Sequence, residues 1–351
     1  MKSVVLEANA KLSLREVPAP VADSRHSVVV RINAAGICGS DVPRAFGGGA
    51  YHYPLVMGHE LSGTVDQANS SSGFSRGDRV VVFPLLPCYK CDACSIGEYA
   101  QCIDYDYLGS RSDGGFAEFI AVPQANLFRI PDHLDSIHAA LTEPTAVALH
   151  ALAKTKVSPG SNAAVFGGGP IGLLTAQWLR VRGANDIYVV DIDPGKLKIA
   201  DDLGFIPINP AIADPVESIR AAAAGGKAGR IDLSVEACGL PLTYRQSLEV
   251  VDTFGEVVLM GNIKGELTLD EKLVSSILRR EISIFGTWNS RVTPRGSNEW
   301  TASLEAMDRT IHIAPIVSHQ ISLAETPKML VEMYHRTVDY LRVVVLPDKI
   351  A

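Results

Sequence analysis

Four cysteines lie close together in the sequence with the spacing C-x2-C-x2-C-x7-C: Cys88, Cys91, Cys94 and Cys102. This spacing places four sulfur atoms on one compact loop, at about residues 86–104, where they can converge on a single metal ion. Four thiolates are a common ligand set for a closed, structural Zn²⁺ site. Two disulfides or an iron–sulfur cluster are the alternatives, but no secretory signal indicates an oxidising compartment, and the spacing differs from those of ferredoxins. We therefore expect a structural zinc lobe in a cytoplasmic protein.

A second set of potential metal ligands is spread along the chain. Cys38 lies on a glycine-flanked turn, His59 and Glu60 lie on a similar turn, and Glu143 is followed by a proline. Taken singly, each has an ordinary structural explanation: a buried thiol, a core histidine, or an acid in the first turn of a helix. Together they supply the ligand types of a catalytic zinc site, which needs three protein ligands and one open position. The sequence therefore allows a catalytic metal site formed by these turns in one cleft.

A glycine-rich turn, residues 167–172, separates an apolar strand run from a helical run and contains the pattern G-x-G-x-x-G. Its glycines allow a tight turn, a close approach of the backbone to a pyrophosphate, and close packing of the helix on the sheet. Asp191 ends the next strand run, and a carboxylate there favours NAD over NADP because it would repel a 2′-phosphate. The alternative is a structural glycine turn followed by a helix-capping Asp. The predicted cofactor-binding residues are Gly167, Gly169, Pro170, Ile171, Gly172 and Asp191.

The elements that must position these residues follow two patterns along the chain. Residues 1–149 contain short β-rich runs separated by Gly, Pro, Asn and Ser, which is typical of a small barrel with long loops. Residues 150–284 alternate apolar strand runs with helical runs, which indicates βαβ units and a doubly wound parallel sheet. The alternation stops after residue 284, and Leu341–Val345 is predicted to be a closing strand. We therefore predict an α/β protein in which residues 285–351 return to the first domain.

The composition argues against several classes of partner. The 351 residues carry a formal net charge of −7, and 47% of them are hydrophobic. A net negative charge opposes nonspecific binding to nucleic acid or to an anionic membrane, and no apolar run reaches membrane-spanning length. We expect a small-molecule substrate, no nucleic acid and no membrane. The run Ser283–Trp288 is predicted to expose an apolar strand edge, which favours a homodimer or a homotetramer.

In this combination and order, the motifs resemble those of the zinc-dependent medium-chain alcohol and polyol dehydrogenases over essentially the whole chain. The resemblance implies a GroES-like catalytic domain built from both chain ends, an inserted Rossmann domain, NAD, and two zinc ions per chain, one catalytic and one structural. It implies that Cys38, His59 and Glu143 hold the catalytic zinc, with Glu60 behind them or as a transient ligand. A Glu rather than a Cys at position 143 implies the polyol branch of the family. The implied reaction is oxidation of a secondary alcohol by hydride transfer from an alkoxide held at the zinc.

One position departs from the family pattern and affects the route of the proton. Many members carry a His five positions after the zinc-binding Cys, as the outer end of a proton relay, and this chain has Pro43 there. Ser40 remains available to hydrogen-bond the reacting oxygen. His52 or water are the possible outer proton acceptors, and an exposed loop histidine without a role is the alternative for His52.

Three longer segments, residues 38–44, 50–54 and 105–115, resemble the hexitol phosphate dehydrogenases of this family, as do residues 286–290 and Glu299-Trp300. They imply oxidation of a sugar alcohol phosphate to a ketose phosphate, with arginines holding the phosphate. The alternative substrates are a free polyol such as sorbitol, a vicinal diol such as butanediol, and L-threonine; the alternative class is a nucleotide-binding relative without catalysis. The predicted substrate residues are Arg44, Tyr51, His52, Arg111 and Trp288, with Arg291 and Arg295 as further candidates.

Overall fold

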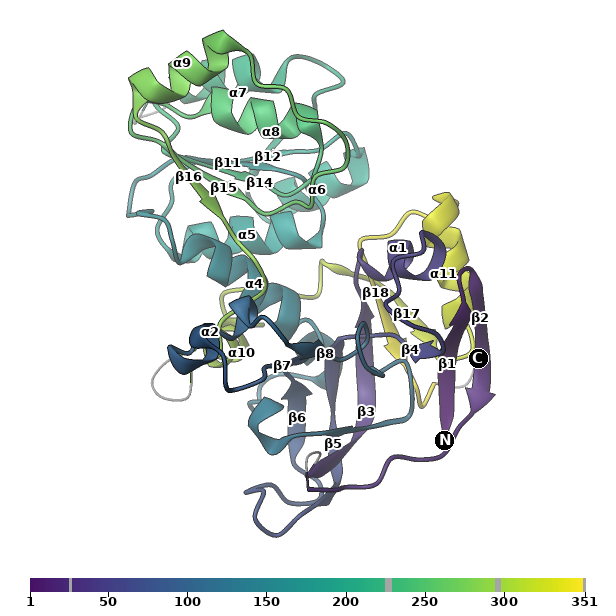
Figure 1. The fold of residues 1–351 in the computed structure, drawn as a ribbon. Coiled ribbons are helices and arrows are strands. Elements are labelled where there is room, and N and C mark those ends of the chain that lie inside the picture. The colour runs from purple at the N-terminus through teal and green to yellow at the C-terminus, as the bar shows by residue number, and fades with distance from the viewer. Residues whose placement is uncertain (25–26, 225–228, 294–297, 350–351) are drawn as a thin grey trace. The chain divides into compact units, whose positions relative to one another are not determined.

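The computed structural model describes residues 1–24, 27–224, 229–293 and 298–349. The chain divides into two compact units, of which unit 1 comprises Met1–Glu143 and Arg291–Ala351, and unit 2 comprises Pro144–Ser290. Unit 2 is therefore an insertion between the two chain ends, whose segments build unit 1 together (Figure 1). The sequence placed these divisions after residue 149 and before residue 285, so both boundaries lie a few residues away from the predicted positions.

Unit 1 is built mainly from antiparallel β-structure, with one parallel pair, β17 with β18. Within the described residues, its main sheet contains β3 (Val28–Ile37), β5 (Glu60–Ala68), β6 (Arg79–Val82), β9 (Phe119–Val122), β10 (Leu127–Arg129), β17 (Val317–Ser322) and β18 (Arg342–Leu346). A smaller sheet has the order β2 (Lys11–Glu16), β1 (Lys2–Ala8), β4 (Leu55–Val56), and β7 (Leu85–Leu86) pairs with β8 (Asp106–Tyr107). Strand β18 pairs with β3, which confirms the predicted closing strand and returns the C-terminal segment to unit 1.

Short helices connect the strands of unit 1. They are α1 (Asp41–Phe46), α2 (Asp92–Ser95), η1 (Tyr99–Gln101), η2 (Gln124–Asn126), α3 (Ser136–Ala139), α10 (Glu299–Ala306) and α11 (Thr326–His335). Helix α4 (Thr142–Leu152) begins at the end of unit 1 and continues into unit 2. In the part of the chain that the structure describes, no helix is both long and apolar enough to span a membrane.

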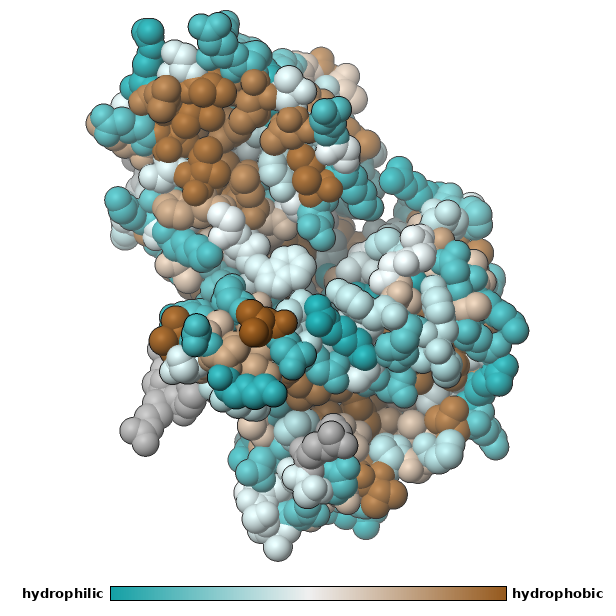
Figure 2. Space-filling model, in the orientation of Figure 1, coloured by the Kyte–Doolittle hydropathy of each residue, from teal (hydrophilic) through white to brown (hydrophobic). Residues whose placement is uncertain are grey.

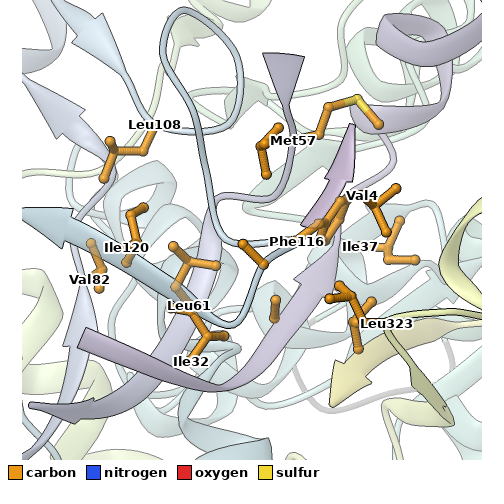
Figure 3. Packing of buried hydrophobic residues seen from close by; sticks show 14 of the residues in the cluster. Val4, Ile32, Ile37, Met57, Leu61, Val82, Leu108, Phe116, Ile120 and Leu323 are labelled. Carbon is orange, nitrogen blue, oxygen red and sulfur yellow. The ribbon is translucent and has the colours of Figure 1, made fainter. Parts of the chain in front are cut away.

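The interior of unit 1 supports the turn that carries His59. Side chains from β1, β3, β5 and the loop before β9 meet in one apolar cluster, which includes Val4, Ile32 and Phe116 (Figure 3). Gly58 has a φ of +95°, and a Cβ atom on it would lie 2.6 Å from the ring of Phe116. Only glycine therefore combines this backbone conformation with this packing, and the next residue is held in a defined place.

Unit 2 contains a parallel sheet with helices on both faces, α7, α8 and α9 on one and α5 on the other (Figure 1). The described strands follow the order β13 (Ile206–Ile208), β12 (Ile187–Val190), β11 (Ala163–Phe166), β14 (Leu233–Glu236), β15 (Glu256–Leu259), β16 (Ser283–Gly286). The helices are α5 (Pro170–Val181), α6 (Pro194–Asp202), α7 (Pro215–Ala224), α8 (Pro241–Val250) and α9 (Glu271–Arg280). This is the 3-2-1-4-5-6 order of a Rossmann sheet, which confirms the predicted fold class.

The central strands of this sheet are buried along their whole length, as expected for strands covered by helices on both faces. Strand β16 instead lies at one edge and is partly exposed. The predicted domain boundary at residue 285 falls inside β16, because this last strand still pairs with β15 through Gly286. The edge position agrees with the exposed strand edge predicted for Ser283–Trp288.

Candidate functional site

The four cysteines of the loop between β7 and β8 converge on one point in unit 1. Their sulfur atoms all lie within 4.8 Å of one another, and the Cys88 and Cys94 sulfurs are 3.9 Å apart. A tetrahedral site with Zn–S bonds of about 2.3 Å has sulfur atoms separated by ~3.8 Å. All four cysteines are free thiols, so the disulfide alternative does not apply. The donor set and its spacing therefore fit a closed zinc site, as the sequence predicted.

Backbone N–H groups of the loop favour the thiolate form of Cys88 and Cys91, whereas burial raises the pKa of the Cys94 thiol. Hydrogen bonds from the backbone of Cys94 and of Ile103 lower the pKa of the Cys91 thiol to about 6. The backbone N–H of Cys88 points at the Cys102 sulfur at 3.3 Å. Because zinc binds the thiolate rather than the thiol, the loop is prepared for the metal.

A second cluster brings together Cys38, His59 and Glu60, whose ligand atoms also lie within 4.8 Å of one another. The register of the main sheet explains this meeting, because Gly36 of β3 lies opposite Glu60 of β5. Cys38 follows the end of β3, and His59 precedes the start of β5. Because these neighbouring strands are antiparallel, the two turns lie at the same end of the strand pair. The cluster contains a thiol, an imidazole and a carboxylate, which fits a catalytic zinc site.

His59 lies beside a buried carboxylate, that of Asp41, which the sequence did not indicate as part of the site. Asp41 is fully buried in α1; one of its oxygens accepts a hydrogen bond from the Cys38 backbone N–H at 3.0 Å, and the other lies 3.6 Å from His59 Nδ1. Burial opposes protonation of His59, but the Asp41 carboxylate and Cys38 raise its pKa to about 10. A cation bound by this cluster would replace that proton, so binding is expected to release protons.

Glu60 is paired with Arg342, a residue from the C-terminal strand β18. Arg342 Nη1 donates to Glu60 Oε1 at 2.8 Å and to the carbonyl of Ile37 at 2.7 Å. Among the described residues the second carboxylate oxygen, Glu60 Oε2, which is buried against Gly36, has no hydrogen-bond partner. A buried residue with an unsatisfied oxygen, clustered with Cys38 and His59, is the arrangement expected of a metal ligand.

Glu143 lies near this cluster but is not one of its three members. It is buried in the first turn of α4, and its Oε1 accepts a hydrogen bond from the Tyr107 hydroxyl at 3.1 Å. Burial raises the pKa of Glu143 to about 7, although His59 acts in the opposite direction. The structure thus gathers Glu60 with Cys38 and His59, whereas the sequence placed Glu143 on the metal and Glu60 behind it.

Two of the residues missed in the sequence had a signal that could have revealed them. Arg342 is a charged residue in the otherwise apolar run Leu341–Val345, and a charge in a buried strand needs a partner. Tyr107 lies in the segment 105–115 that was singled out, but only its neighbour Arg111 was chosen from it.

The predicted substrate residues do not all lie together. The Arg111 guanidinium lies over the rings of Tyr51 and Tyr105, at 4.7 Å and 4.2 Å from their centres, and its Nη1 donates to the carbonyl of Tyr105. Both ring nitrogens of His52 contact carbonyl oxygens, of Pro54 at 3.1 Å and of Arg111 at 3.0 Å. A carbonyl oxygen only accepts and a neutral imidazole has one N–H, so the ring donates to one of these carbonyls while its other nitrogen faces the second.

The other candidates have different surroundings. Arg44 Nη1 pairs with buried Asp41 at 2.7 Å, and Arg291 pairs with Glu98 of the cysteine loop at 2.8 Å. Trp288 belongs to unit 2 and is 53% exposed, while Arg295 lies outside the described residues.

The Ser40 hydroxyl, at the start of α1, is exposed and makes no capping hydrogen bond. It is therefore free to bond another group.

The glycine-rich turn in unit 2 has the form that its pattern predicted. It connects β11 to α5, with Gly169 at the N-cap and Pro170 at the first helical position. Gly167 has a φ of +117°, and a Cβ atom on Gly172 would collide with the Gly167 carbonyl. The helix therefore packs closely against the strand and presents free backbone N–H groups at its start, where a pyrophosphate binds in this fold.

Asp191 stands at the end of β12, beside this turn. Its two carboxylate oxygens accept hydrogen bonds from the backbone N–H groups of Gly168 at 2.8 Å and Asp193 at 2.9 Å. A carboxylate can accept about four hydrogen bonds, so each oxygen retains a free lone pair. Asp191 thus orients the glycine-rich turn and can still accept hydrogen bonds from a ribose.

A β-rich unit with two thiol-containing clusters, interrupted by a Rossmann sheet, defines the class of zinc-dependent medium-chain dehydrogenases. Residues 24–132 match the alcohol dehydrogenase GroES-like domain, and residues 170–309 match the zinc-binding dehydrogenase family. The chain belongs to the zinc-dependent medium-chain alcohol dehydrogenase family and is an oxidoreductase, as its motifs predicted.

Among individual relatives, galactitol 1-phosphate 5-dehydrogenase of Escherichia coli (strain K12) is 34% identical over 325 residues, 91% of this chain and 92% of its own length. Sorbitol dehydrogenase of Bacillus subtilis (strain 168) is 32% identical over 99% of this chain and 98% of its own. The crystal structure of the E. coli galactitol-1-phosphate dehydrogenase superposes with a TM-score of 0.92, at 31% identity and over 99% and 100% of the two chains. A zinc-binding dehydrogenase of Sinorhizobium meliloti 1021, bound to NADP, reaches 0.90 at 30% identity over 99% of both chains.

Proposed function

We propose that the protein is a zinc- and NAD-dependent polyol phosphate dehydrogenase that oxidises a hexitol phosphate to a ketose phosphate. The observation that carries the reaction class is the cluster of Cys38, His59 and Glu60, in which Glu60 retains a carboxylate oxygen without a hydrogen bond among the described residues. The similarity to galactitol 1-phosphate 5-dehydrogenase supports a phosphorylated substrate. We further propose two zinc ions per chain, one in this cluster and one in the four-cysteine loop.

In this proposal Cys38, His59 and Glu60 hold the catalytic metal. A bound Zn²⁺ supplies a Lewis acid that makes a substrate hydroxyl acidic near neutral pH. Arg342 balances the charge of Glu60 and binds one of its two carboxylate oxygens, Oε1. Ser40 offers a hydroxyl that can receive the proton and pass it to water, since its side chain makes no capping bond. We place water rather than His52 after Ser40, because the ring nitrogens of His52 lie against the backbone carbonyls of Pro54 and Arg111.

The proposed cofactor is NAD rather than NADP. Asp191 supplies negative charge where the 2′-phosphate of NADP would lie, and its free lone pairs suit ribose hydroxyls. The NADP found in the S. meliloti relative shows that NADP occurs in similar folds, so the preference of this chain is a matter for direct measurement.

We assign the phosphate of the substrate to Arg111 rather than to Arg44. Arg44 uses Nη1 for buried Asp41, and its side chain is only 13% exposed. Arg111 uses only Nη1 in hydrogen bonds with the described residues, and two aromatic rings fix the plane of its guanidinium. The remaining N–H groups can bind a phosphate in the paired geometry that a guanidinium favours.

The test compares a hexitol 1-phosphate with the free hexitol, each with NAD⁺ and with NADP⁺. We expect oxidation of the phosphate with NAD⁺, and a decrease in kcat/KM of roughly 10- to 150-fold in Arg111→Ala, the range for losing a hydrogen bond to a charged group. Arg111→Ala should leave the free hexitol unaffected. Arg129→Ala is the matched control, because Arg129 also lies over an aromatic ring, that of Phe74 at 4.5 Å, but its guanidinium is paired with Asp78 at 3.0 Å.

Two results would replace this proposal. Equal kcat/KM for the free hexitol and its phosphate would favour a free-polyol dehydrogenase. Activity with a vicinal diol or L-threonine, and none with either hexitol, would move the protein to another branch of the family. If Arg111→Ala and Arg129→Ala behave alike on the phosphate, the reaction stands and the assignment of Arg111 is wrong.

We also propose that the chain forms a homodimer or homotetramer in the cytoplasm. Figure 2 shows apolar residues gathered on one face of unit 2, and the exposed apolar side chains of that unit include Leu278 at 73% and Ile284 at 44%. Ile284 lies on the edge strand β16, whose backbone can pair with a second copy. Light scattering that finds only monomer at micromolar concentration would contradict the oligomer. A reducing cytoplasm would keep the four cysteines of the loop as thiolates.

A further inference from the structure

The hydroxyl of Tyr107 occupies a defined position beside the metal cluster. Tyr107 lies on β8, where it pairs with Leu85 of β7. Its ring packs edge-on against the ring of His59, with 5.7 Å between the ring centres and 64° between the planes. The strand pairing and the ring contact fix the direction of the phenol, and its hydroxyl donates to Glu143 Oε1 at 3.1 Å.

Glu143 has little else to hold it in place. Its side chain is 7% exposed, and among the described residues its carboxylate has no other hydrogen bond and no ion pair. A buried carboxylate without a direct ion pair is costly, and the positive charges that act on Glu143 are those of His59 and Arg342. Both lie at the cluster of Cys38, His59 and Glu60, which contains three potential ligands and does not include Glu143.

We propose that Tyr107 is a positioning residue that keeps Glu143 outside the coordination sphere of the catalytic metal. With Glu143 restrained, Glu60 completes the set of three protein ligands and the fourth position stays open for the substrate. This inference rests on the proposed function, because it requires that the cluster binds a metal ion. Under this inference, the hydroxyl of Tyr107 determines that Glu60, and not Glu143, binds the metal ion.

Tyr107→Phe removes that hydroxyl while retaining the ring contact with His59. In this variant Glu143 is expected to join the ligands and close the open position. The metal ion should then bind more tightly, while the alcohol substrate meets a blocked site. We expect kcat/KM for the alcohol to decrease on the order of 10- to 100-fold, as for other changes just outside a metal site. The decrease should come mainly from a higher KM for the alcohol, with the KM for NAD⁺ unchanged.

The experiment uses the full-length enzyme with Co²⁺ in place of the catalytic metal. Its visible absorption reports the number and type of ligands, and competition with a chelator reports the affinity. In Tyr107→Phe the absorption spectrum should change to that of a site with an added ligand, and the chelator should remove the metal more slowly. Tyr334→Phe is the control, because it removes a phenolic hydroxyl from a half-exposed ring on α11 in the same unit. It should match the unmodified enzyme in both readouts.

Glu143→Ala provides a second, independent test. If Tyr107 keeps Glu143 away from the metal, Glu143→Ala leaves the affinity for Co²⁺ unchanged, and Tyr107→Phe has no additional effect in that background. A clear loss of metal affinity in Glu143→Ala overturns the inference, because it shows Glu143 to be a direct ligand. An unchanged spectrum and unchanged kinetics in Tyr107→Phe also overturn it.

The two proposals fail in distinguishable ways. If the unmodified enzyme shows no absorption from Co²⁺ bound by the Cys38 thiolate, the proposed function is wrong and the inference about Tyr107 falls with it. If Co²⁺ binds and supports activity but Tyr107→Phe behaves like Tyr334→Phe, only the inference about Tyr107 is wrong.

Discussion

The buried ion pair between Arg342 and Glu60 connects the C-terminal strand to the metal cluster. Arg342 is 4% exposed and Glu60 is fully buried, and a distance of 2.8 Å separates Nη1 from Oε1. The same nitrogen also donates to the carbonyl of Ile37 at 2.7 Å. Arg342→Met keeps most of the apolar stem but leaves a buried carboxylate without its cation.

The expected cost follows from this geometry. Removing one partner of a buried ion pair costs about 3–5 kcal/mol, because the remaining charge is left uncompensated. For a unit of this size each kcal/mol lowers Tm by roughly 2–4 °C, so metal-free Arg342→Met should melt about 6–20 °C below the unmodified protein. Zinc should restore much of this loss, since a bound cation replaces the missing charge beside Glu60.

Thermal unfolding with and without a chelator measures both effects. Arg31→Met is the control, because Arg31 pairs with Asp348 at 2.6 Å with both side chains exposed, and such a surface pair contributes about 0–1 kcal/mol. Adding Glu60→Gln to Arg342→Met removes the uncompensated charge and should recover part of the stability. The reasoning is refuted if metal-free Arg342→Met melts within about 2 °C of the control, or if the double variant is less stable than Arg342→Met alone.

Three further predictions concern pH, cofactor and metal. Burial raises the pKa of Glu143 from 4.5 to about 7 in the metal-free folded chain. Between pH 4.5 and about 7 the folded chain therefore keeps a proton on Glu143 that the unfolded chain has lost. The contribution of Glu143 to the free energy of unfolding therefore decreases as the pH rises through this range. Glu143→Gln should flatten that slope in thermal unfolding, and an unchanged slope would show that Glu143 does not titrate there. Asp191→Ala should weaken NAD⁺ binding and narrow the preference over NADP⁺ in kcat/KM; equal use of both cofactors by the unmodified enzyme contradicts our reading of Asp191. A chelator should remove the metal of the open cluster first, with loss of activity, because the four-cysteine loop encloses its ion; activity that survives loss of the first zinc, by metal analysis, would contradict the assignment.

The sequence by itself determined the features that depend on neighbouring residues. The four cysteines are close enough in the chain for their spacing alone to predict one site, and the structure brings their sulfurs together. The glycine-rich turn was recognisable because a tight strand–turn–helix unit requires glycine at Gly167, for its positive φ, and at Gly172, for the close packing of the helix. The alternation of strand and helix runs predicted the parallel sheet, since each βαβ unit is a local pattern.

The cluster of Cys38, His59 and Glu60 depends on contacts between distant parts of the chain, and only the tertiary structure decided it. The register that sets Gly36 opposite Glu60 brings Glu60 to the end of β3, beside Cys38, and no local pattern reports that register. Glu60 gains its counter-charge from Arg342, at the far end of the chain. A long-range ion pair of this kind is specified by strand pairing and burial. The residue types alone could therefore indicate both Glu60 and Glu143 as candidate ligands, but they could not show which of the two lies with Cys38 and His59.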